Sequence, residues 1–352
     1  FSPAGRHLET LNAVTGEPVY QFHYDSAGRL ERIVDRNSNM TLIRRRSDGT
    51  PYEIVAPQGQ RTALELDSNG YLLNVTNPAG EITHLVHDEI GLLQYLLTPL
   101  HQQYQYRYDD EGYLTQTMGP WMDFNTLSRA TSDRTTSATL CTALGRTKAY
   151  ATKRLTTGAK QLTVQYPDGC LKTVIRTPDG GQQIEFPNGV VLSETQGPDP
   201  RFGMEAPVTE QMTLQMPSGL SWQLETERSV EPEDGEYFYD VERLETRRNI
   251  NQKEYVMVLD RDTGTMTTTT PEGRQFVTTL DSRDRPASAQ FGDLAPVVYH
   301  YDADGRLSAC TRDDGVINRS FQYAYGPDGK LARVTDPLGR QYEFEYDRAG
   351  RV

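Results

Sequence analysis

The sequence predicts an all-β protein, an antiparallel ribbon built from a repeated unit of 21 residues with two short strands and two tight turns. Three observations carry this prediction: a glycine that recurs at a fixed interval, alternating aromatic residues before many of these glycines, and a second turn signal further along the unit. A period of this length is typical of repeat proteins, which act as scaffolds through their shape. The interval separates Gly28, Gly49, Gly70, Gly91 and Gly112.

The same unit returns near the other end of the chain. It reads Tyr-Asp-Ala-Asp-Gly-Arg-Leu at 301–307, Tyr-Gly-Pro-Asp-Gly-Lys-Leu at 325–331 and Tyr-Asp-Arg-Ala-Gly-Arg-Val at 346–352. The unit is therefore clearest at 1–115 and 295–352, with a less regular region at 116–294 between them.

The residues that lead into these glycines predict the first strand of the unit. Aromatic side chains alternate there with polar neighbours, and a period of two is typical of a strand with one buried face. We expect them to form a structural aromatic ladder, with a binding surface for glycans or a protein receptor as the alternative. The ladder comprises Tyr20, Phe22, Tyr24, Tyr104, Tyr106, Tyr108, Tyr299, Tyr301, Phe321, Tyr323, Tyr325, Tyr342, Phe344 and Tyr346.

An aspartate and the glycine then predict a tight turn. The carboxylate of Asp accepts local backbone N–H groups, and Gly tolerates the left-handed conformation that closes a short hairpin loop. The residues assigned to these structural turns are Asp25, Gly28, Gly49, Asp67, Gly70, Asp88, Gly91, Asp109, Gly112, Asp302, Gly305, Gly329, Asp347 and Gly350.

The second strand of the unit has apolar residues three apart, as in Leu30 and Ile33, which breaks the alternation expected of a strand. A β-bulge would explain this spacing. A second turn signal with Pro and Gly follows, at Pro57-Gln58-Gly59 and at Pro78-Ala79-Gly80. The ribbon is expected to have unsatisfied strand edges only at its two ends, where self-association is a candidate outcome.

The region 116–294 predicts further hairpins with irregular insertions. Turns with shorter arms are expected around Gly169, Gly180 and Gly189. Three segments lack clean alternation and are interpreted as surface loops, with specific contacts as the alternative. These are 119–148, the proline-rich Gly197–Pro207, which is not expected to join a central strand, and the acidic Ser229–Glu236. The whole chain, 1–352, is expected to be one β domain.

Composition excludes several classes of protein. Hydrophobic residues make up 36% of the chain, which suits a sheet with one wet face. A formal charge of −13 argues against nucleic acid as a partner. No apolar run approaches the roughly 18 residues of a membrane helix, so we expect no membrane insertion.

The sequence gives little sign of catalysis. Three scattered cysteines, Cys141, Cys170 and Cys310, make neither a disulfide framework nor a metal cluster. His84 and His87 lie three apart, so on a strand they face opposite sides and predict no shared metal. No nucleotide loop or nucleophile elbow occurs. We therefore expect no enzyme and no cofactor; a glycosidase-like carboxylate pair, which forms only in space, stays an alternative.

The Tyr-Asp-x-x-Gly-Arg motifs at 24–29 and 301–306, together with the Pro-x-Gly turns, give a chain that resembles the RHS or YD-repeat family. This family includes bacterial polymorphic toxins, insecticidal Tc toxins and teneurins. The resemblance implies a β-sheet that winds spirally into a hollow shell around a toxin domain or, in teneurins, serves cell adhesion. Toxin-bearing members cleave themselves with acidic residues near an Asp-Pro-x-Gly segment. Asp336 begins such a segment, but it sits at an ordinary repeat turn and receives no catalytic role.

The expected function is therefore structural: part of a shell that encloses or presents another polypeptide, in a secreted or cell-surface protein of bacterial origin. The expected partners are flanking parts of the same polypeptide or an enclosed toxin domain. A teneurin-like recognition module and a self-cleaving shell are the alternatives. Both ends of the sequence lie inside a repeat, so we interpret the chain as a piece of a longer protein with its targeting signals elsewhere. About 17 units with strands about 4.8 Å apart make one turn about 50 Å wide, a partial wall.

Overall fold

The computed structural model describes residues 1–121, 123–232 and 241–352, which form one antiparallel sheet of 30 strands without a helix. Each strand packs beside the strands before and after it in the sequence, so the chain is a continuous meander. The predicted all-β ribbon of paired strands is confirmed. Only β1 and β30, at the ends of the meander, pair on one side alone.

The strands are short in the regular units and longer in the middle of the chain. The first half comprises β1 Glu9–Leu11, β2 Pro18–Tyr24, β3 Leu30–Asp35, β4 Met40–Arg45, β5 Pro51–Val55, β6 Arg61–Leu66, β7 Leu72–Thr76, β8 Ile82–His87, β9 Leu93–Leu97, β10 Gln103–Tyr108, β11 Leu114–Met118, β12 Phe124–Ser132, β13 Thr135–Thr142, β14 Thr147–Arg154 and β15 Lys160–Gln165. The second half comprises β16 Leu171–Arg176, β17 Gln182–Glu185, β18 Val191–Asp199, β19 Gly203–Gln215, β20 Ser221–Pro232, β21 Val241–Ile250, β22 Lys253–Asp260, β23 Thr265–Thr269, β24 Gln275–Leu280, β25 Pro286–Phe291, β26 Val297–Tyr301, β27 Leu307–Asp313, β28 Asn318–Tyr325, β29 Leu331–Thr335 and β30 Gln341–Glu343.

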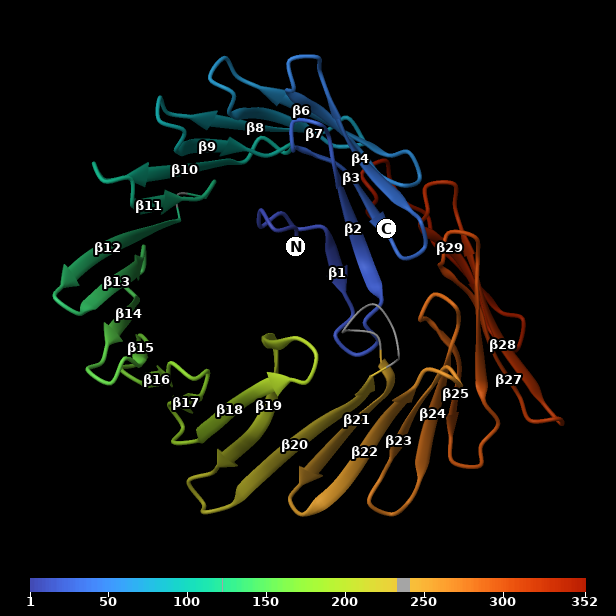
Figure 1. Ribbon diagram of the computed structural model, residues 1–352. Coiled ribbons are helices and arrows are strands. Elements are labelled where there is room, and N and C mark those ends of the chain that lie inside the picture. The colour runs from blue at the N-terminus through green and yellow to red at the C-terminus, as the bar shows by residue number, and fades with distance from the viewer. Residues whose placement is uncertain (122, 233–240) are drawn as a thin grey trace.

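The sheet curves into a spiral that passes its own beginning, and Figure 1 shows the last strands returning beside β3 and β4. Hydrogen bonds join residues 265 and 268 positions apart at this return, from Asn39 to Asp304 and from Gln60 to Asp328. The expectation of a single turn is therefore wrong, because one turn uses fewer residues than the chain has. The coil overlaps itself where these hydrogen bonds form.

Successive turns of a meander lie on opposite edges of the sheet, so the spiral has two rims. The rim that carries turns such as 25–28, 67–70, 302–305 and 347–350 is called the Tyr-Asp rim. The rim that carries turns such as 35–38, 56–59, 77–80 and 98–101 is called the Pro-Gly rim. Where the coil overlaps, the Pro-Gly rim of the first turn meets the Tyr-Asp rim of the second.

A β-bulge precedes the tyrosine position of the regular unit, as the apolar spacing predicted. His23 pairs with Arg32 while Tyr24 pairs with Leu30, so Glu31 is the extra residue. The bulge explains why Leu30 and Ile33 lie three apart. The same shift occurs before Leu66, Tyr108, Tyr301 and Tyr325.

The described residues form a sheet of a single layer, and most of its aromatic ladder residues are half-buried. The first aromatics of three strands stay exposed: Tyr20 at 46%, Phe321 at 41% and Tyr342 at 52%. No second layer among the described residues covers these side chains, so they are shielded only by neighbours on the same face. The most deeply buried apolar cluster, Val241, Leu244 and Leu259, lies in the middle of the chain.

Two of the three irregular segments, 119–148 and 197–207, contain strands where they are described. Residues 123–148 contain all of β12 and β13 and the start of β14, with β12 and β13 in a regular ladder from Asn125↔Thr142 to Ser132↔Thr135. Thr and Ser, which fill this segment, are compatible with an exposed strand although they give no apolar alternation.

Gly197–Pro207 also joins strands, contrary to expectation, as the outer arms of the β18–β19 hairpin. Pro198 falls in an irregularity between the Gly197↔Val208 and Asp199↔Gly203 pairs, where a missing N–H removes no ladder bond. Ser229–Pro232 belongs to β20, and the remainder of Ser229–Glu236 lies outside the described residues. The single-domain assignment stays a prediction.

Candidate functional site: the seam between the spiral turns

The Tyr-Asp turns are built around one carboxylate. In the turn at 302–306, Asp302 Oδ1 accepts the backbone N–H groups of Asp304 at 3.1 Å and Arg306 at 2.8 Å. Its Oδ2 accepts Arg306 Nε at 2.7 Å, while the N–H of Gly305 bonds the carbonyl of Asp302 at 3.0 Å. Gly305 has φ +81°, a left-handed backbone conformation that residues other than Gly adopt only with strain.

The other turn residues assigned from the sequence take corresponding places. Asp25, Asp67, Asp88, Asp109 and Asp347 each accept the backbone N–H group four residues on. The glycines Gly28, Gly49, Gly70, Gly91, Gly112, Gly329 and Gly350 all have positive φ. An arginine pairs with Asp25 and Asp347 as with Asp302, at Arg29 and Arg351.

The tyrosine at the end of the first strand of a unit, such as Tyr301, links that unit to the preceding one. Tyr301 Oη donates to the carbonyl of Pro286 at 2.9 Å, and its ring lies 4.1 Å from the guanidinium of Arg285. Arg45 occupies a tyrosine position and contacts the carbonyl of Leu30, 15 residues back, the same separation as from Tyr301 to Pro286. Hydroxyl bonds of this kind join Tyr24 to His7, Tyr108 to Leu93, Tyr325 to Leu307 and Tyr346 to Leu331.

The remaining ladder residues make no such contact, and all but Phe344, which follows β30, lie on strands. Tyr323 Oη lies 3.7 Å from Cys310 Sγ, and burial followed by this contact raises the pKa of the Tyr323 hydroxyl. Phe22 packs against His7, with ring centroids 4.4 Å apart. The half-buried Tyr104, Tyr106, Tyr299 and Phe344 complete the ladder together with the exposed Tyr20, Phe321 and Tyr342.

The seam joins the two rims through polar contacts between turns. Asn39 Nδ2 donates to the carbonyl of Asp304 at 2.9 Å, and Gln60 Nε2 donates to that of Asp328. Arg351 Nη2 bonds Glu81 Oε1 at 2.8 Å. Asn39, Gln60 and Glu81 are 21 residues apart, so one position of the repeated unit holds the overlap together.

Two arginines tie the start of the seam. Arg285 Nη1 donates to Asn37 Oδ1 at 3.1 Å. Arg261 contacts two carboxylates, Asp284 at 2.8 Å and Glu17 at 2.7 Å. Glu17 belongs to the first Pro-Gly turn of the chain, between β1 and β2.

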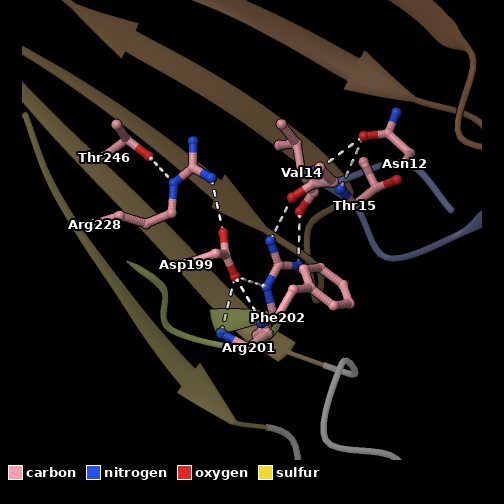
Figure 2. Close-up of polar contacts among 9 residues, drawn as sticks. Asn12, Val14, Thr15, Asp199, Arg201, Phe202, Arg228 and Thr246 are labelled. Atoms are coloured by element: carbon pink, nitrogen blue, oxygen red, sulfur yellow. Dashed lines mark hydrogen bonds and ion pairs between the residues drawn. The ribbon is translucent and has the colours of Figure 1, made fainter. Parts of the chain in front are cut away.

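A buried ion cluster anchors this same turn from another side (Figure 2). Asp199, whose side chain is 0% exposed, accepts Arg228 Nη1 at 2.9 Å and Arg201 Nε at 3.4 Å. The guanidinium of Arg201 turns away from the hairpin and donates to the carbonyls of Ala13 and Val14, at 2.5 and 3.2 Å. Asp199 thus joins its own hairpin to β20, and Arg201 joins that hairpin to residues 13 and 14.

Hydrogen bonds decide the charge of this cluster. Burial opposes ionisation of Asp199, but N–H groups of Arg201 and Phe202 and the guanidinium of Arg228 outweigh it and lower the pKa of the Asp199 carboxyl. Val14, whose carbonyl accepts from Arg201, packs against the apolar cluster of Val241, Leu244 and Leu259. The ionised carboxylate of Asp199 is therefore buried and paired with Arg201 and Arg228.

Sequence reasoning missed the arginines and amides that make the seam. The predicted turn motif contained Arg29, Arg306 and Arg351 at one recurring position, but the sequence analysis did not predict that they pair with the turn aspartate. The period of 21 residues through Asn39, Gln60 and Glu81 was an available signal. The partners across the overlap were not, because the pitch of the spiral sets them.

Residues weighed for chemistry are accounted for by local structure. Asp336 caps its own turn: burial opposes ionisation, but Arg340 and backbone N–H groups lower the pKa of its carboxyl. His84 bonds Asn74 at 2.7 Å and His87 lies against Tyr71, 5.6 Å between ring centroids. Within 1–121, 123–232 and 241–352, no group of three His, Cys, Asp or Glu side chains is arranged to hold a metal ion. None of the described segments contains a helix suited to cross a membrane.

Comparison with known proteins agrees with this geometry. The family described as Teneurin YD-shell matches the chain over residues 1–352, so the chain belongs to the teneurin YD-shell family. Teneurin-4 of Mus musculus is 42% identical over 60 residues, and Teneurin-1 of Homo sapiens is 45% identical over 60 residues. Each match covers 17% of this chain and 2% of the teneurin, so the chain spans a small part of these relatives.

Solved structures show the same fold at low identity. The crystal structure of TcdB2-TccC3-Cdc42 matches 95% of this chain and 24% of its own, with a TM-score of 0.54 and 11% identity. TcdB2-TccC3 without its hypervariable C-terminal region matches 94% of this chain and 22% of its own, with a TM-score of 0.55 and 11% identity. The family and the fold give this chain a structural role in the wall of a YD shell.

Proposed function

We propose that this chain forms a section of shell wall that encloses or presents another polypeptide, such as a secreted toxin domain. The seam is the observation that carries the proposal. Contacts such as Asn39 with Asp304 fasten the second turn to the first and give a continuous curved wall. A wall that only displayed its strands would not need its rims locked together.

Catalysis is not needed for this role. The recurring residues of the unit are used in turn capping, strand packing or seam contacts, and the chain acts as an inert scaffold. A location outside the cell or on its surface follows from a role in delivering or presenting a polypeptide.

The test is protection of a passenger. An unstructured polypeptide is fused after Val352, and its digestion by a protease is followed with time. We expect slower digestion in the native wall than in a seam variant, Asn39→Ala with Gln60→Ala. Gln165→Ala with Gln215→Ala, at exposed strand positions outside the seam, is the matched control. Equal digestion in all three proteins would contradict enclosure.

A recognition module is the second candidate, favoured by the 60-residue match to teneurins. On this account the exposed Tyr20 and Tyr342 contact a glycan or a protein receptor. Binding of the labelled chain to a glycan array, lost in Tyr20→Ala with Tyr342→Ala, would support it. Incubation followed by intact-mass analysis tests the third candidate, a self-cleaving shell, which needs a cut at a unique peptide bond.

A further inference from the structure

Three basic side chains stand directly opposite one another on neighbouring strands. Arg154 of β14 pairs with Lys160 of β15, and Lys160 pairs in turn with Arg176 of β16. Directly paired residues of an antiparallel sheet project from the same face, with Cβ atoms about 5 Å apart. All three residues are exposed, and none makes an ion pair or a side-chain hydrogen bond with a described residue. Arg154, Lys160 and Arg176 are called the basic row.

The surroundings of the basic row leave its charge unbalanced. The residues that share its face in β14–β16 include no carboxylate. Asp179, in the turn that follows β16, accepts the hydroxyl of Thr177, and Glu194, two strands further on, accepts the amide of Gln182. These carboxylates are therefore used in local contacts and do not pair with the row.

Other basic residues of the wall have partners. Arg243 and Arg247 both bond Glu245, and Lys148 and Lys172, on the same face as the basic row, lie over aromatic rings. Like charges directly opposite one another destabilise a sheet. The basic row thus carries an energetic cost that no contact among the described residues offsets, which indicates a ligand of opposite charge.

The basic row faces the inside of the spiral. Val14, from the turn between β1 and β2, packs against the cluster that contains Leu244 and Leu259. Figure 1 shows β1 inside the ring that the later strands form, so the face that carries Leu244 is the inner face. The pairing register continues this face strand by strand from Leu244 to Lys160. The row therefore lies on the surface that a polypeptide inside the wall would meet.

We propose that the basic row binds an acidic segment of the polypeptide inside the wall. The inference rests on the proposed enclosing function and assigns the chemistry of what is enclosed. The row spans two strand spacings, about 10 Å, which a few consecutive carboxylate residues of an extended chain can cover. The formal charge of −13 over the whole chain repels a long polyanion such as nucleic acid, whereas a short acidic stretch meets only the local positive field.

Fluorescence anisotropy of a labelled oligoglutamate peptide, mixed with the purified chain, tests the binding. We expect the native chain to bind the peptide, and the binding to weaken as salt is added. The row variant, Arg154→Gln with Lys160→Gln and Arg176→Gln, should bind at least about tenfold more weakly. No binding by the native chain, or equal binding by the row variant, would overturn the proposal.

A control variant removes the same charge from the other face of the sheet. It combines Arg32→Gln, Arg107→Gln and Lys153→Gln, all at exposed positions. We expect it to bind the peptide as the native chain does, and a loss equal to that of the row variant would show that net charge alone attracts the peptide. A single-stranded oligonucleotide that binds at the row more tightly than oligoglutamate would also overturn the assignment to an acidic polypeptide.

Urea denaturation separates a binding role of the row from a structural one. Removing like charges that face one another should raise the urea midpoint of the row variant above that of the control variant. A lower midpoint would overturn the proposal, because the basic side chains would then stabilise the wall itself. Loss of peptide binding with passenger protection intact rejects this inference alone. Equal passenger digestion in the native and seam-variant proteins, with peptide binding intact, rejects enclosure alone.

Discussion

Arg306 joins two successive repeats. Its Nε lies 2.7 Å from Asp302 Oδ2 in its own turn, and its guanidinium lies 4.5 Å from the ring centroid of Tyr325 in the next unit. Arg285 makes the same two contacts, with Asp281 and Tyr301. The Tyr, Asp and Arg of the motif therefore form one set of contacts, which joins each of these units to the next along the Tyr-Asp rim.

Replacing Arg306 tests whether its contacts with Asp302 and Tyr325 stabilise the protein. Arg306→Met should lower the free energy of unfolding by about 1–2 kcal/mol, because a charge-assisted hydrogen bond and a cation–π contact are lost together. Arg306→Lys should cost less, since an ammonium keeps the charge without the planar fork. Urea denaturation measures the change. Arg319→Met, at an exposed position on β28, is the control, and an equal loss there would contradict a special role for Arg306.

Two glycines separate backbone strain from seam contact. Gly70 and Gly305 have similar φ, +87° and +81°, but a Cβ at Gly70 meets open space whereas one at Gly305 meets the Asn37 side chain across the seam. Gly70→Ala should cost about 1–2 kcal/mol, from the left-handed backbone alone. Gly305→Ala should cost more, because Asn37 must also give up its bond to Arg285.

Thermal and urea unfolding of both alanine variants provides the measurement. If Gly70→Ala proves as costly as Gly305→Ala, the close approach of the two turns is not important for stability.

The buried cluster predicts a larger effect. Asp199→Ala should destabilise the protein by about 3–5 kcal/mol, because Arg201 and Arg228 would keep buried charges without a counterion. Hydrogen exchange should accelerate at residues 12–17, which Arg201 holds. Asp262→Ala, an exposed turn carboxylate, should change neither quantity appreciably. Unchanged exchange at 12–17 in Asp199→Ala would show that the Asp199 cluster does not hold this turn.

Stability should depend on acid in a defined direction. The pKa of Asp199 and Asp302 lies below the ordinary 3.8, because hydrogen bonds and arginines outweigh the burial that opposes ionisation. The unfolded chain then binds more protons than the folded chain, so the free energy of unfolding falls as pH drops. The contribution is fully present well above pH 3.8 and is lost as pH falls from there through the lowered values. Urea midpoints between pH 7 and 2.5 measure it.

Asp199→Asn provides the comparison for this dependence. The variant should be less stable near neutral pH and should show a smaller loss on acidification, since one of the shifted carboxyls is gone. A variant as acid-sensitive as the native protein would show that other carboxyls carry the effect.

The amino-acid sequence by itself determined the repeating unit. Alternating aromatics, the Asp and Gly of the turns and the three-residue apolar spacing are local signals, and the strands, turns and bulges they predicted are formed by residues close in the chain. The same reasoning failed at 119–148 and 197–207, where Thr- and Ser-rich or Pro-containing strands lack apolar alternation. Tertiary structure alone decided which rim residues meet. The pairing of Asn39 with Asp304, and of Arg201 with Ala13, depends on the curvature and pitch of the whole sheet, which arise from small twists summed over many strands.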